Sequence, residues 1–199
     1  MKKLILSLFI VASLVSLGSV ADAQEVKIVA FGASQTAGKG VGEPDAYPAQ
    51  LERILKAEGY TVSVDNQGID GDTTRDLLSR MARAVPEATR IVILQPGTND
   101  KSSTKKRTAL TSAETRSNVE QMLAKFRERN ISAILLGFPG EGGREIAEAN
   151  GAVWYGPPNK NVSSDMIQAD GQHFTKEGYA VLAKNMSLLI KQMLASLPK

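Results

Sequence analysis

Five short apolar runs, each rich in β-branched residues, recur along the chain and predict the strands of a sheet. They cover residues 26–31, 60–67, 90–95, 131–138 and 151–156. The third run, RIVILQ, is apolar almost throughout, which is typical of a parallel strand that is covered on both faces. The segments between the runs are long enough to hold a helix in most connections.

Helical periodicity appears in the segments between these runs. In the first of them Leu51, Ile54 and Leu55 recur at the spacing of one helix face, and Gly59 follows as a stop. Further helices are predicted within 71–85 and 112–129, in a short piece around 143–150, and over 176–197. This alternation of strands and helices indicates one α/β domain of the doubly wound kind, with a mainly parallel sheet.

Two of these helices have candidate N-terminal caps. Asp72 or Thr73 precedes the apolar face of the helix within 71–85. If Ser112 caps the next helix, the acidic partner of a capping box would stand at position 115, but Glu114 comes one place early. The sequence therefore predicts the first cap and gives the second little support.

The first 23 residues have the layout of a secretory signal peptide. Lys2 and Lys3 precede an apolar stretch over 4–20, and Ala-Asp-Ala follows at 21–23. A membrane anchor is the alternative, but the stretch is short for a span and is interrupted by serines. We expect cleavage after Ala23, a single domain over 24–199, a periplasmic or secreted location, and no stable membrane insertion after cleavage.

Composition and charge narrow the class of protein only slightly. The chain has 24 basic and 21 acidic residues, and without residues 1–23 the net charge is +2, which gives no argument for a nucleic-acid partner. The basic cluster KSSTKKRT at 101–108 is expected to be a solvated loop, with contact to an anionic surface or substrate as the alternative. Because the chain has no cysteine, packing has to stabilise an exported domain without disulfides.

The loop after the first predicted strand reads GASQTAGKG and raises two interpretations, a phosphate-binding loop and a nucleophile. A phosphate-binding loop needs glycine at position 33 and a hydroxyl residue after Lys39, but the chain has Ala33 and Gly40. The loop also continues into VGEPDAYP, which does not predict an immediate helix. The nucleotide interpretation is therefore disfavoured.

Ser34 is the candidate nucleophile, because it follows the first predicted strand directly. A serine needs a base to accept its proton, and His173 is the one histidine in the chain. A lone histidine is more often structural, but this one lies in a polar loop, QADGQHFTKEGY, just before the last predicted helix. Asp170 precedes it by three residues and can fix the ring tautomer that leaves the other nitrogen available to Ser34.

Two further strand ends supply candidate hydrogen-bond donors for a developing oxyanion. Gly71 can bring a backbone N–H close to a substrate, and Asn99 can offer a side-chain N–H. Taken singly, Gly71 is equally consistent with an ordinary turn, and Asn99 with Asp100 is equally consistent with a helix cap. Functional loops of a parallel sheet gather beyond the carboxyl ends of its strands, so all these residues are expected in one crevice.

Taken together, the segments FGASQTAG, IDGDTT, GTND and DGQH resemble the four sequence blocks of the SGNH, or GDSL-type, hydrolases. The resemblance implies a flavodoxin-like α/β/α sandwich with a five-stranded sheet, and hydrolysis of acyl esters through an acyl-serine. It also implies an oxyanion hole from the Ser34 N–H, the Gly71 N–H and the Asn99 side chain, without a cofactor. Segments such as GDTT and GTND look like those of the thioesterase, lysophospholipase and arylesterase branch.

Two positions depart from the family pattern. Ala33 stands where the family commonly has aspartate, and Gln35 replaces the usual apolar residue. The aspartate is not the proton acceptor in the family scheme, so Ala33 leaves the mechanism possible while it could loosen the loop around Ser34. These departures keep open a non-catalytic binding module that retains the fold.

The segment over 139–169 is short and leaves room for only a small helix, which predicts a shallow site suited to short acyl groups. We therefore expect an exported esterase acting on small acyl esters, thioesters or aryl esters, with a carbohydrate O-deacetylase as the alternative. Its expected partners are small esters or acylated saccharides. Trp154 and Tyr155 could stack on a substrate ring, although such strand aromatics more often belong to the core. A metal enzyme is disfavoured, because one histidine and no cysteine leave only carboxylates as ligands.

Overall fold

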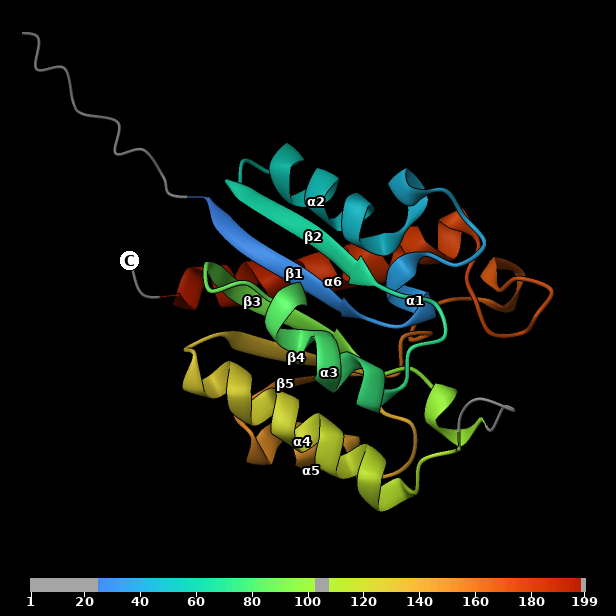
Figure 1. Cartoon of the computed structure of the whole chain (residues 1–199). Coiled ribbons are helices and arrows are strands. Elements are labelled where there is room, and N and C mark those ends of the chain that lie inside the picture. Colours follow the sequence, from blue (N-terminus) through green and yellow to red (C-terminus); the bar gives the residue numbers. More distant parts are fainter. Residues whose placement is uncertain (1–24, 103–107, 198–199) are drawn as a thin grey trace, which may run out of the picture.

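The computed structural model describes residues 25–102 and 108–197. The predicted signal peptide and most of the basic cluster at 101–108 lie outside these residues. Figure 1 shows a twisted sheet of five parallel strands in the order β2-β1-β3-β4-β5. The strands are β1 (Val26–Gly32), β2 (Val62–Gly68), β3 (Thr89–Gln95), β4 (Ser132–Leu136) and β5 (Val153–Gly156).

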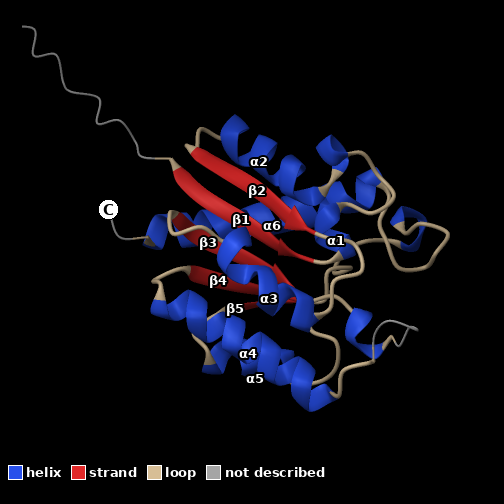
Figure 2. Cartoon of the chain, viewed as in Figure 1, coloured by secondary structure: helices blue, strands red, loops and turns tan. Residues whose placement is uncertain are grey.

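Helices cover both faces of this sheet, which gives the three layers visible in Figure 2. One face is covered by α2 (Tyr47–Ala57) and α6 (Lys176–Ser196). The other face is covered by α3 (Thr74–Ala84), α4 (Ser112–Glu128) and α5 (Gly143–Ala149). The predicted doubly wound α/β fold is therefore confirmed.

The side chains of the central strands alternate between two hydrophobic cores. In β3, Val92 and Leu94 pack with α3 and α4, whereas Ile91 and Ile93 pack with α2 and α6. All four are fully buried, as the apolar run in the sequence predicted. Fully burying each such side chain stabilises the fold by about 1.5–3 kcal/mol, so the sheet is a rigid base for the loops at its ends.

The strand order of the sheet changes direction between β1 and β3, which makes this the topological switch point of the sheet. From β1 the chain first passes to β2 at one edge and later returns to β3 on the other side of β1. Gly32 at the end of β1 is in register with Gly68 on β2 and Gln95 on β3, so the three strands end together. Their carboxyl ends point to the right in Figure 1, and this point of reversal is where parallel α/β sheets bind ligands.

A short helix that the sequence did not predict starts at the end of β1. It is α1 (Ser34–Ala37), and it ends at Gly38 in the left-handed conformation. Four residues are too few to show helical periodicity, so the loop was expected to continue without a helix. Three 3₁₀ turns complete the elements within the described residues, namely η1 (Glu43–Asp45), η2 (Asn99–Lys101) and η3 (Ser164–Met166).

The two helix caps differ in how well they were predicted. Thr73, one of the two candidates, caps α3 in a capping box with Asp76. The cap of α4 is Thr111, with Glu114 completing its box, and not Ser112, which the sequence supported only weakly. The sequence TSAE has the spacing of a capping box once it is counted from Thr111, so the mismatch came from choosing the wrong hydroxyl residue.

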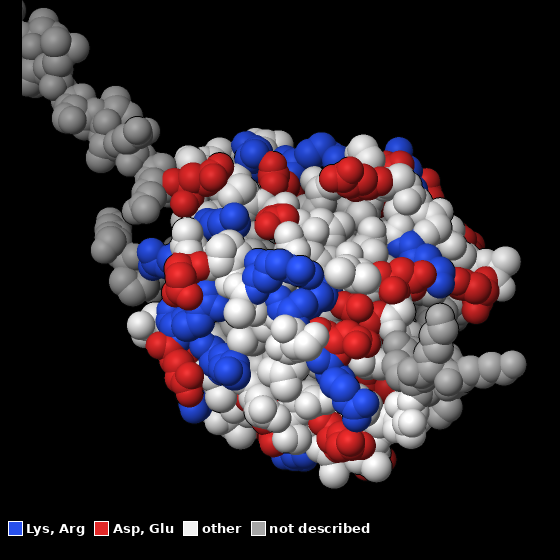
Figure 3. Space-filling view, viewed as in Figure 1, with Lys and Arg blue, Asp and Glu red and all other residues white. Residues whose placement is uncertain are grey.

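The surface carries charges of both signs. On the face formed by α3 and α4, basic and acidic side chains are intermixed (Figure 3). Within the residues that the structure describes, no helix combines the length and the apolar character needed to span a bilayer.

Candidate active site

The end of β1 holds Ser34 in a close-packed turn. Ala33 is fully buried, and its N–H donates to both the backbone oxygen and the Oε1 of Gln95, each at 3.2 Å. Gly32 is required here, since a Cβ would lie 2.4 Å from the Oγ1 of Thr36. Ala33, which stands in place of the family aspartate, gives α1 no side-chain cap. The hydrogen bonds of its N–H with Gln95 on β3 hold the turn instead.

Ser34, His173 and Asp170 form one hydrogen-bonded chain. The Ser34 Oγ lies 2.9 Å from His173 Nε2, and His173 Nδ1 lies 2.6 Å from Asp170 Oδ2. The second carboxylate oxygen accepts the backbone N–H groups of Gln172 and His173, both at 2.9 Å. With Nδ1 donating to the carboxylate, Nε2 is left as an acceptor for the serine proton.

The carboxylate of Asp170 is stabilised in its charged form. The hydrogen bond from the His173 ring, followed by the two backbone N–H groups of the same loop, holds the pKa of Asp170 well below its ordinary value. His173 is 3% exposed, so its ring is shielded, whereas the side chain of Asp170 is 44% exposed. Such a pair keeps one ring tautomer and supports a positive charge on the imidazole when it forms.

The loop that carries His173 is anchored to the rest of the molecule. The Gln168 N–H donates to the His173 carbonyl oxygen at 2.7 Å, and Ile167 forms an antiparallel bridge with Phe174. The Gln168 side chain donates to the backbone oxygen of Lys39 at 2.9 Å. Because Lys39 directly follows the turn of Ser34, this bond ties the histidine loop to the serine loop.

The two candidate oxyanion donors lie together after β2 and β3. Gly71 has a φ of +85°, a conformation that favours glycine. The Asn99 Nδ2 donates to the backbone oxygen of Asp72 at 2.9 Å, which places its amide beside Gly71. The Ile69 N–H donates to the Gly32 oxygen at 3.0 Å, so this loop also contacts the end of β1.

Three polar residues that the sequence reasoning did not select link the loops of the crevice. The Gln35 amide donates to the Gln172 backbone oxygen at 2.9 Å, and the Gln172 side chain donates to the Thr98 Oγ1 at 2.9 Å. Gln35, noted in the sequence only as a departure from the family, thus joins the serine turn to the histidine loop. Its replacement of an apolar residue was the one available signal.

The acidic residues near the crevice are held by protein partners. Asp70 pairs with Lys39 at 3.0 Å. The lysine that a phosphate-binding loop would use for phosphate thus contacts a carboxylate. Asp72 pairs with Arg80 at 2.6 Å. Asp100 is buried and accepts the Thr74 N–H at the start of α3, so it acts as a cap from another loop. Within residues 25–102 and 108–197, no group of three potential metal ligands gathers.

Two adjoining cavities open at this edge of the sheet. Ser34, Gln172 and Phe174 line the first, of about 250 Å³. The second, of about 270 Å³, is largely apolar and is lined by Phe138 and Trp154 among others. Gly97, Thr98 and Pro158 line both, so the second cavity is next to the serine. Trp154 thus belongs both to the core and to the wall of this cavity.

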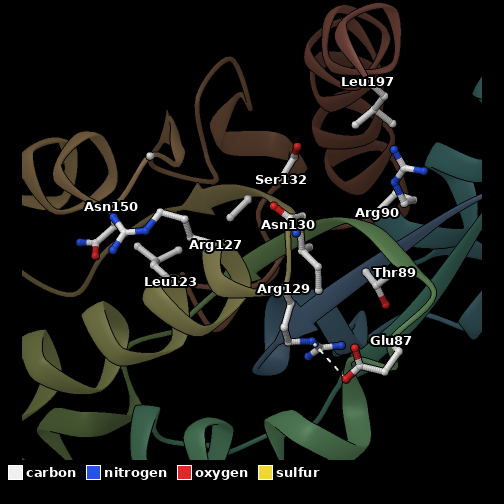
Figure 4. Close-up of a pocket in the computed structure, with 13 residues that line it drawn as sticks. Glu87, Thr89, Arg90, Leu123, Arg127, Arg129, Asn130, Ser132, Asn150 and Leu197 are labelled. Atoms are coloured by element: carbon white, nitrogen blue, oxygen red, sulfur yellow. Dashed lines mark ion pairs between the residues drawn. The ribbon is translucent and has the colours of Figure 1, made fainter. Parts of the chain in front are cut away.

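A larger cavity, of about 600 Å³, lies at the opposite ends of the strands (Figure 4). Its arginines point in different directions: Arg129 pairs with Glu87 and donates to the Val85 oxygen, whereas Arg127 extends toward Asn150. Their guanidinium groups do not converge on a common point, and none of the predicted site residues lines this cavity. The candidate active site is therefore the edge with Ser34.

This geometry can be compared with known proteins. The model of the "GDSL-like Lipase/Acylhydrolase family" matches residues 30–181, which include the Ser34 turn and the His173 loop. The chain belongs to this family. It is accordingly a carboxylic ester hydrolase of the SGNH type, as the four sequence blocks predicted.

Individual relatives agree with the family assignment. The chain is 28% identical to Esterase TesA of Pseudomonas aeruginosa, with 92% of this chain and 95% of that protein covered. Its fold is similar to the crystal structure of the psychrotrophic esterase EstA from Pseudoalteromonas sp., inhibited by monoethylphosphonate, with a TM-score of 0.73, 20% identity, and 86% and 100% of the two chains covered. It is also similar to the acetyl xylan esterase AlAXEase, with a TM-score of 0.66, 21% identity, and 83% and 100% covered.

Proposed function

We propose that Ser34, His173 and Asp170 are the catalytic residues of a serine esterase that works through an acyl-serine. In the first step the Ser34 Oγ attacks the acyl carbonyl carbon while His173 Nε2 takes the serine proton. The protonated ring then gives this proton to the departing alcohol or thiol, and Asp170 stabilises its charge. In the second step His173 takes a proton from water, and the water oxygen attacks the carbonyl carbon of the acyl-serine. The bond to the Ser34 oxygen then breaks, the ring returns the proton to this oxygen, and the acid leaves.

The observation that carries this proposal is the hydrogen-bonded chain from Ser34 to Asp170. His173 is the one histidine in the sequence, so no other imidazole could take its place as the base. The negative charge that develops on the carbonyl oxygen is assigned to three donors: the Ser34 N–H, the Gly71 N–H and the Asn99 side chain. Donors of this kind contribute about 3–4 kcal/mol each to transition-state stabilisation. The contact of Asn99 with the Gly71–Asp72 segment supports this grouping.

The preferred substrates are short acyl esters, thioesters or aryl esters. The apolar cavity beside Ser34 has about 270 Å³, just below the roughly 300–1,000 Å³ typical of pockets for drug-sized ligands. The helix α5 comes shortly after the segment 136–140 that lines this cavity. It has only seven residues, so it adds little apolar surface to the binding site. A long acyl chain would leave much of its surface in water and gain little binding energy.

Steady-state kinetics on p-nitrophenyl acetate tests the assignment of the residues. We expect turnover by the wild type, and its reduction to background in Ser34→Ala and His173→Ala. Ser164→Ala, an exposed serine of the turn η3 that precedes this loop, is the matched control and should keep the wild-type rate. Sustained turnover in His173→Ala would contradict the proposal, because no other histidine could accept the proton. A folded wild type without turnover would favour the binding-module interpretation instead.

Carbohydrate O-deacetylation is the second candidate. Two observations support it. The cavity that Ser34 lines is open to solvent, and the acetyl xylan esterase AlAXEase has a similar fold. Comparing acetylated xylan and peptidoglycan fragments with p-nitrophenyl acetate separates the two. A strong preference for the polymers would make the deacetylase the better description.

We also propose that the protein is exported and acts in the periplasm or outside the cell. The support is the signal-peptide pattern of residues 1–23 in front of a domain that starts with β1. Expression of the full chain in a Gram-negative host, followed by N-terminal sequencing of the periplasmic fraction, is expected to give a chain that starts at Gln24. An uncleaved cytoplasmic product would contradict this.

A further inference from the structure

Arg80 is a buried arginine on α3 that lies beneath the candidate oxyanion hole. Its side chain is 9% exposed, and its Nε donates to Asp72 Oδ2 at 2.6 Å. Its Nη2 donates to two backbone oxygens, that of Gly32 at 3.1 Å and that of Gln67 at 3.0 Å. The guanidinium carbon also lies 4.7 Å from the centre of the Phe31 ring.

Each partner of Arg80 lies next to a segment that carries a proposed oxyanion donor. Gly32 ends β1 two residues before Ser34, and Gln67 is the next-to-last residue of β2, four before Gly71. Asp72 directly follows Gly71. The backbone oxygen of Asp72 accepts the Asn99 amide, so the third donor is reached through the same residue. One guanidinium group therefore connects all three donor segments.

These contacts require the shape of an arginine. A guanidinium group is planar, permanently charged, and presents donors in fixed directions, which suits a carboxylate on one side and two carbonyl oxygens on another. Lysine would offer a single compact ammonium group and could not keep the same separations. A buried ion pair is costly to desolvate and adds little stability by itself, so its value here lies in fixing geometry.

We propose that Arg80 is a positioning residue of the oxyanion hole, which sets the distance between the turn of Ser34 and the loop of Gly71 and Asn99. This inference rests on the proposed function. Donors stabilise the transition state only when they are held where the charge develops, so loosening them should lower kcat more than it raises KM.

The test compares Arg80→Met with Arg75→Met in p-nitrophenyl acetate turnover. Arg75 is on the same helix, is 58% exposed and pairs only with Glu114 among the described residues, which makes it the matched control. We expect Arg80→Met to lower kcat about tenfold to a hundredfold with KM within about twofold, by analogy with the loss of supporting contacts in other sites. Arg75→Met should behave as the wild type.

Affinity for phenylboronic acid separates positioning from a merely structural role. Its boron becomes tetrahedral and anionic when the Ser34 oxygen adds to it, so its hydroxyl oxygen occupies the place of the oxyanion. Arg80→Met should lower the affinity for this inhibitor by the same factor by which it lowers kcat. If Arg80→Met does not fold, Arg80→Lys serves instead, with a smaller loss expected in both quantities.

The outcomes for Arg80 and for the proposed function are distinguishable. Wild-type protein that turns over, with Ser34→Ala inactive, upholds the proposed function regardless of Arg80. The inference on Arg80 is overturned if the folded variant keeps kcat within about twofold of the wild type, or if kcat falls while boronate affinity is unchanged. Restored turnover when millimolar guanidinium chloride is added to Arg80→Ala would support it further.

Discussion

At the scale of single residues, Asp170 has two tasks at once. One carboxylate oxygen binds the ring of His173, and the other accepts two backbone N–H groups of its own loop. The loop is therefore shaped around the carboxylate that orients the ring. The two backbone N–H groups thus hold this partly exposed carboxylate in place beside the ring.

Replacing Asp170 by asparagine should separate these tasks. The amide keeps the shape of the side chain, but its NH₂ group can turn toward His173 and favour the wrong ring tautomer. In serine proteases the equivalent change lowers kcat about 10⁴-fold, and we expect a loss of about 10³-fold or more here. Asp165→Asn, in the neighbouring turn η3, is the control in the same kinetic assay and should have no effect.

The lowered pKa of Asp170 has a consequence for stability. A carboxyl group with a depressed pKa in the folded state stabilises that state above its ordinary pKa of 3.8, and this contribution is lost as the pH falls below it. The difference in melting temperature between the wild type and Asp170→Asn should therefore shrink on going from neutral pH to below 3.8. A difference that stays constant over this range would show that the carboxylate is not specifically stabilised.

The sequence singled out the three residues that form the hydrogen-bonded chain, but not the residues that connect their loops. Ser34 and His173 stood out because their types are chemically distinctive and only one histidine is present. The contact between Gln35 and Gln172 joins residues 137 positions apart and depends on the conformations of two loops. Nothing in the local sequence specifies such a pairing.

At the scale of elements, the start of α3 supports the site directly. Thr73 caps this helix in a capping box with Asp76, immediately after Gly71 and Asp72. The cap of α4, Thr111 with Glu114, has the same chemistry, but Thr111 stands twelve residues after Asn99, whereas Thr73 stands two residues after Gly71. The two caps therefore form a matched pair for separating stability from activity.

Thr73→Ala and Thr111→Ala should each lower the free energy of unfolding by about 1 kcal/mol, the usual contribution of such a cap. Only Thr73→Ala should also lower kcat, because fraying of the first turn of α3 displaces the Gly71 segment. Urea unfolding and turnover of p-nitrophenyl acetate measure the two effects. Equal kcat values in both variants would show that the start of α3 does not position the site.

A buried carboxylate joins α3 to α4. Asp100 is 1% exposed and accepts hydrogen bonds from the Thr74 N–H and from the hydroxyl groups of Thr74 and Thr115, at 2.6–2.7 Å. Asp100→Ala would leave these donors buried without an acceptor, so we expect the free energy of unfolding to fall by roughly 3 kcal/mol or more. Denaturant unfolding measures it, and a loss below about 1 kcal/mol would contradict the account.

Most elements were predictable because each has either a period of its own or a distinctive apolar run. The exceptions are α1 and the three 3₁₀ turns, which are too short for a period, and the cap of α4, where two neighbouring hydroxyl residues compete. The turn of α1 depends on tertiary contacts, whereas the cap of α4 is local, since Thr111 and Glu114 are three residues apart. The turn of α1 is held by β3 through Gln95, a residue distant in the sequence.

At the scale of the whole molecule, the parallel sheet brings the four sequence blocks together. Their meeting at one edge follows from strand direction alone, which is why it could be expected from the order of the elements. The size of the cavities could not, because it depends on how the segment after β4 packs. Gly143, for example, lets α5 approach the ring of Trp154, where a Cβ would lie 2.6 Å from a ring carbon.

The wall of the apolar cavity should determine the length of acyl chain that is accepted. Phe138→Ala removes a ring from this wall and enlarges the cavity, so we expect a rise in kcat/KM for hexanoate and octanoate esters relative to acetate. Leu188→Ala, an exposed residue of α6, is the control. An unchanged chain-length profile in Phe138→Ala would show that the acyl group binds elsewhere.

Covalent labelling with a fluorophosphonate tests the central claim most directly. Trypsin cuts the chain after Lys27 and Lys39, and the resulting peptide over 28–39 has Ser34 as its only serine. The account predicts one label per molecule, at Ser34, with loss of p-nitrophenyl acetate turnover in proportion to labelling, and no label in His173→Ala. Labelling at another residue, or full turnover in a protein labelled at Ser34, would contradict it.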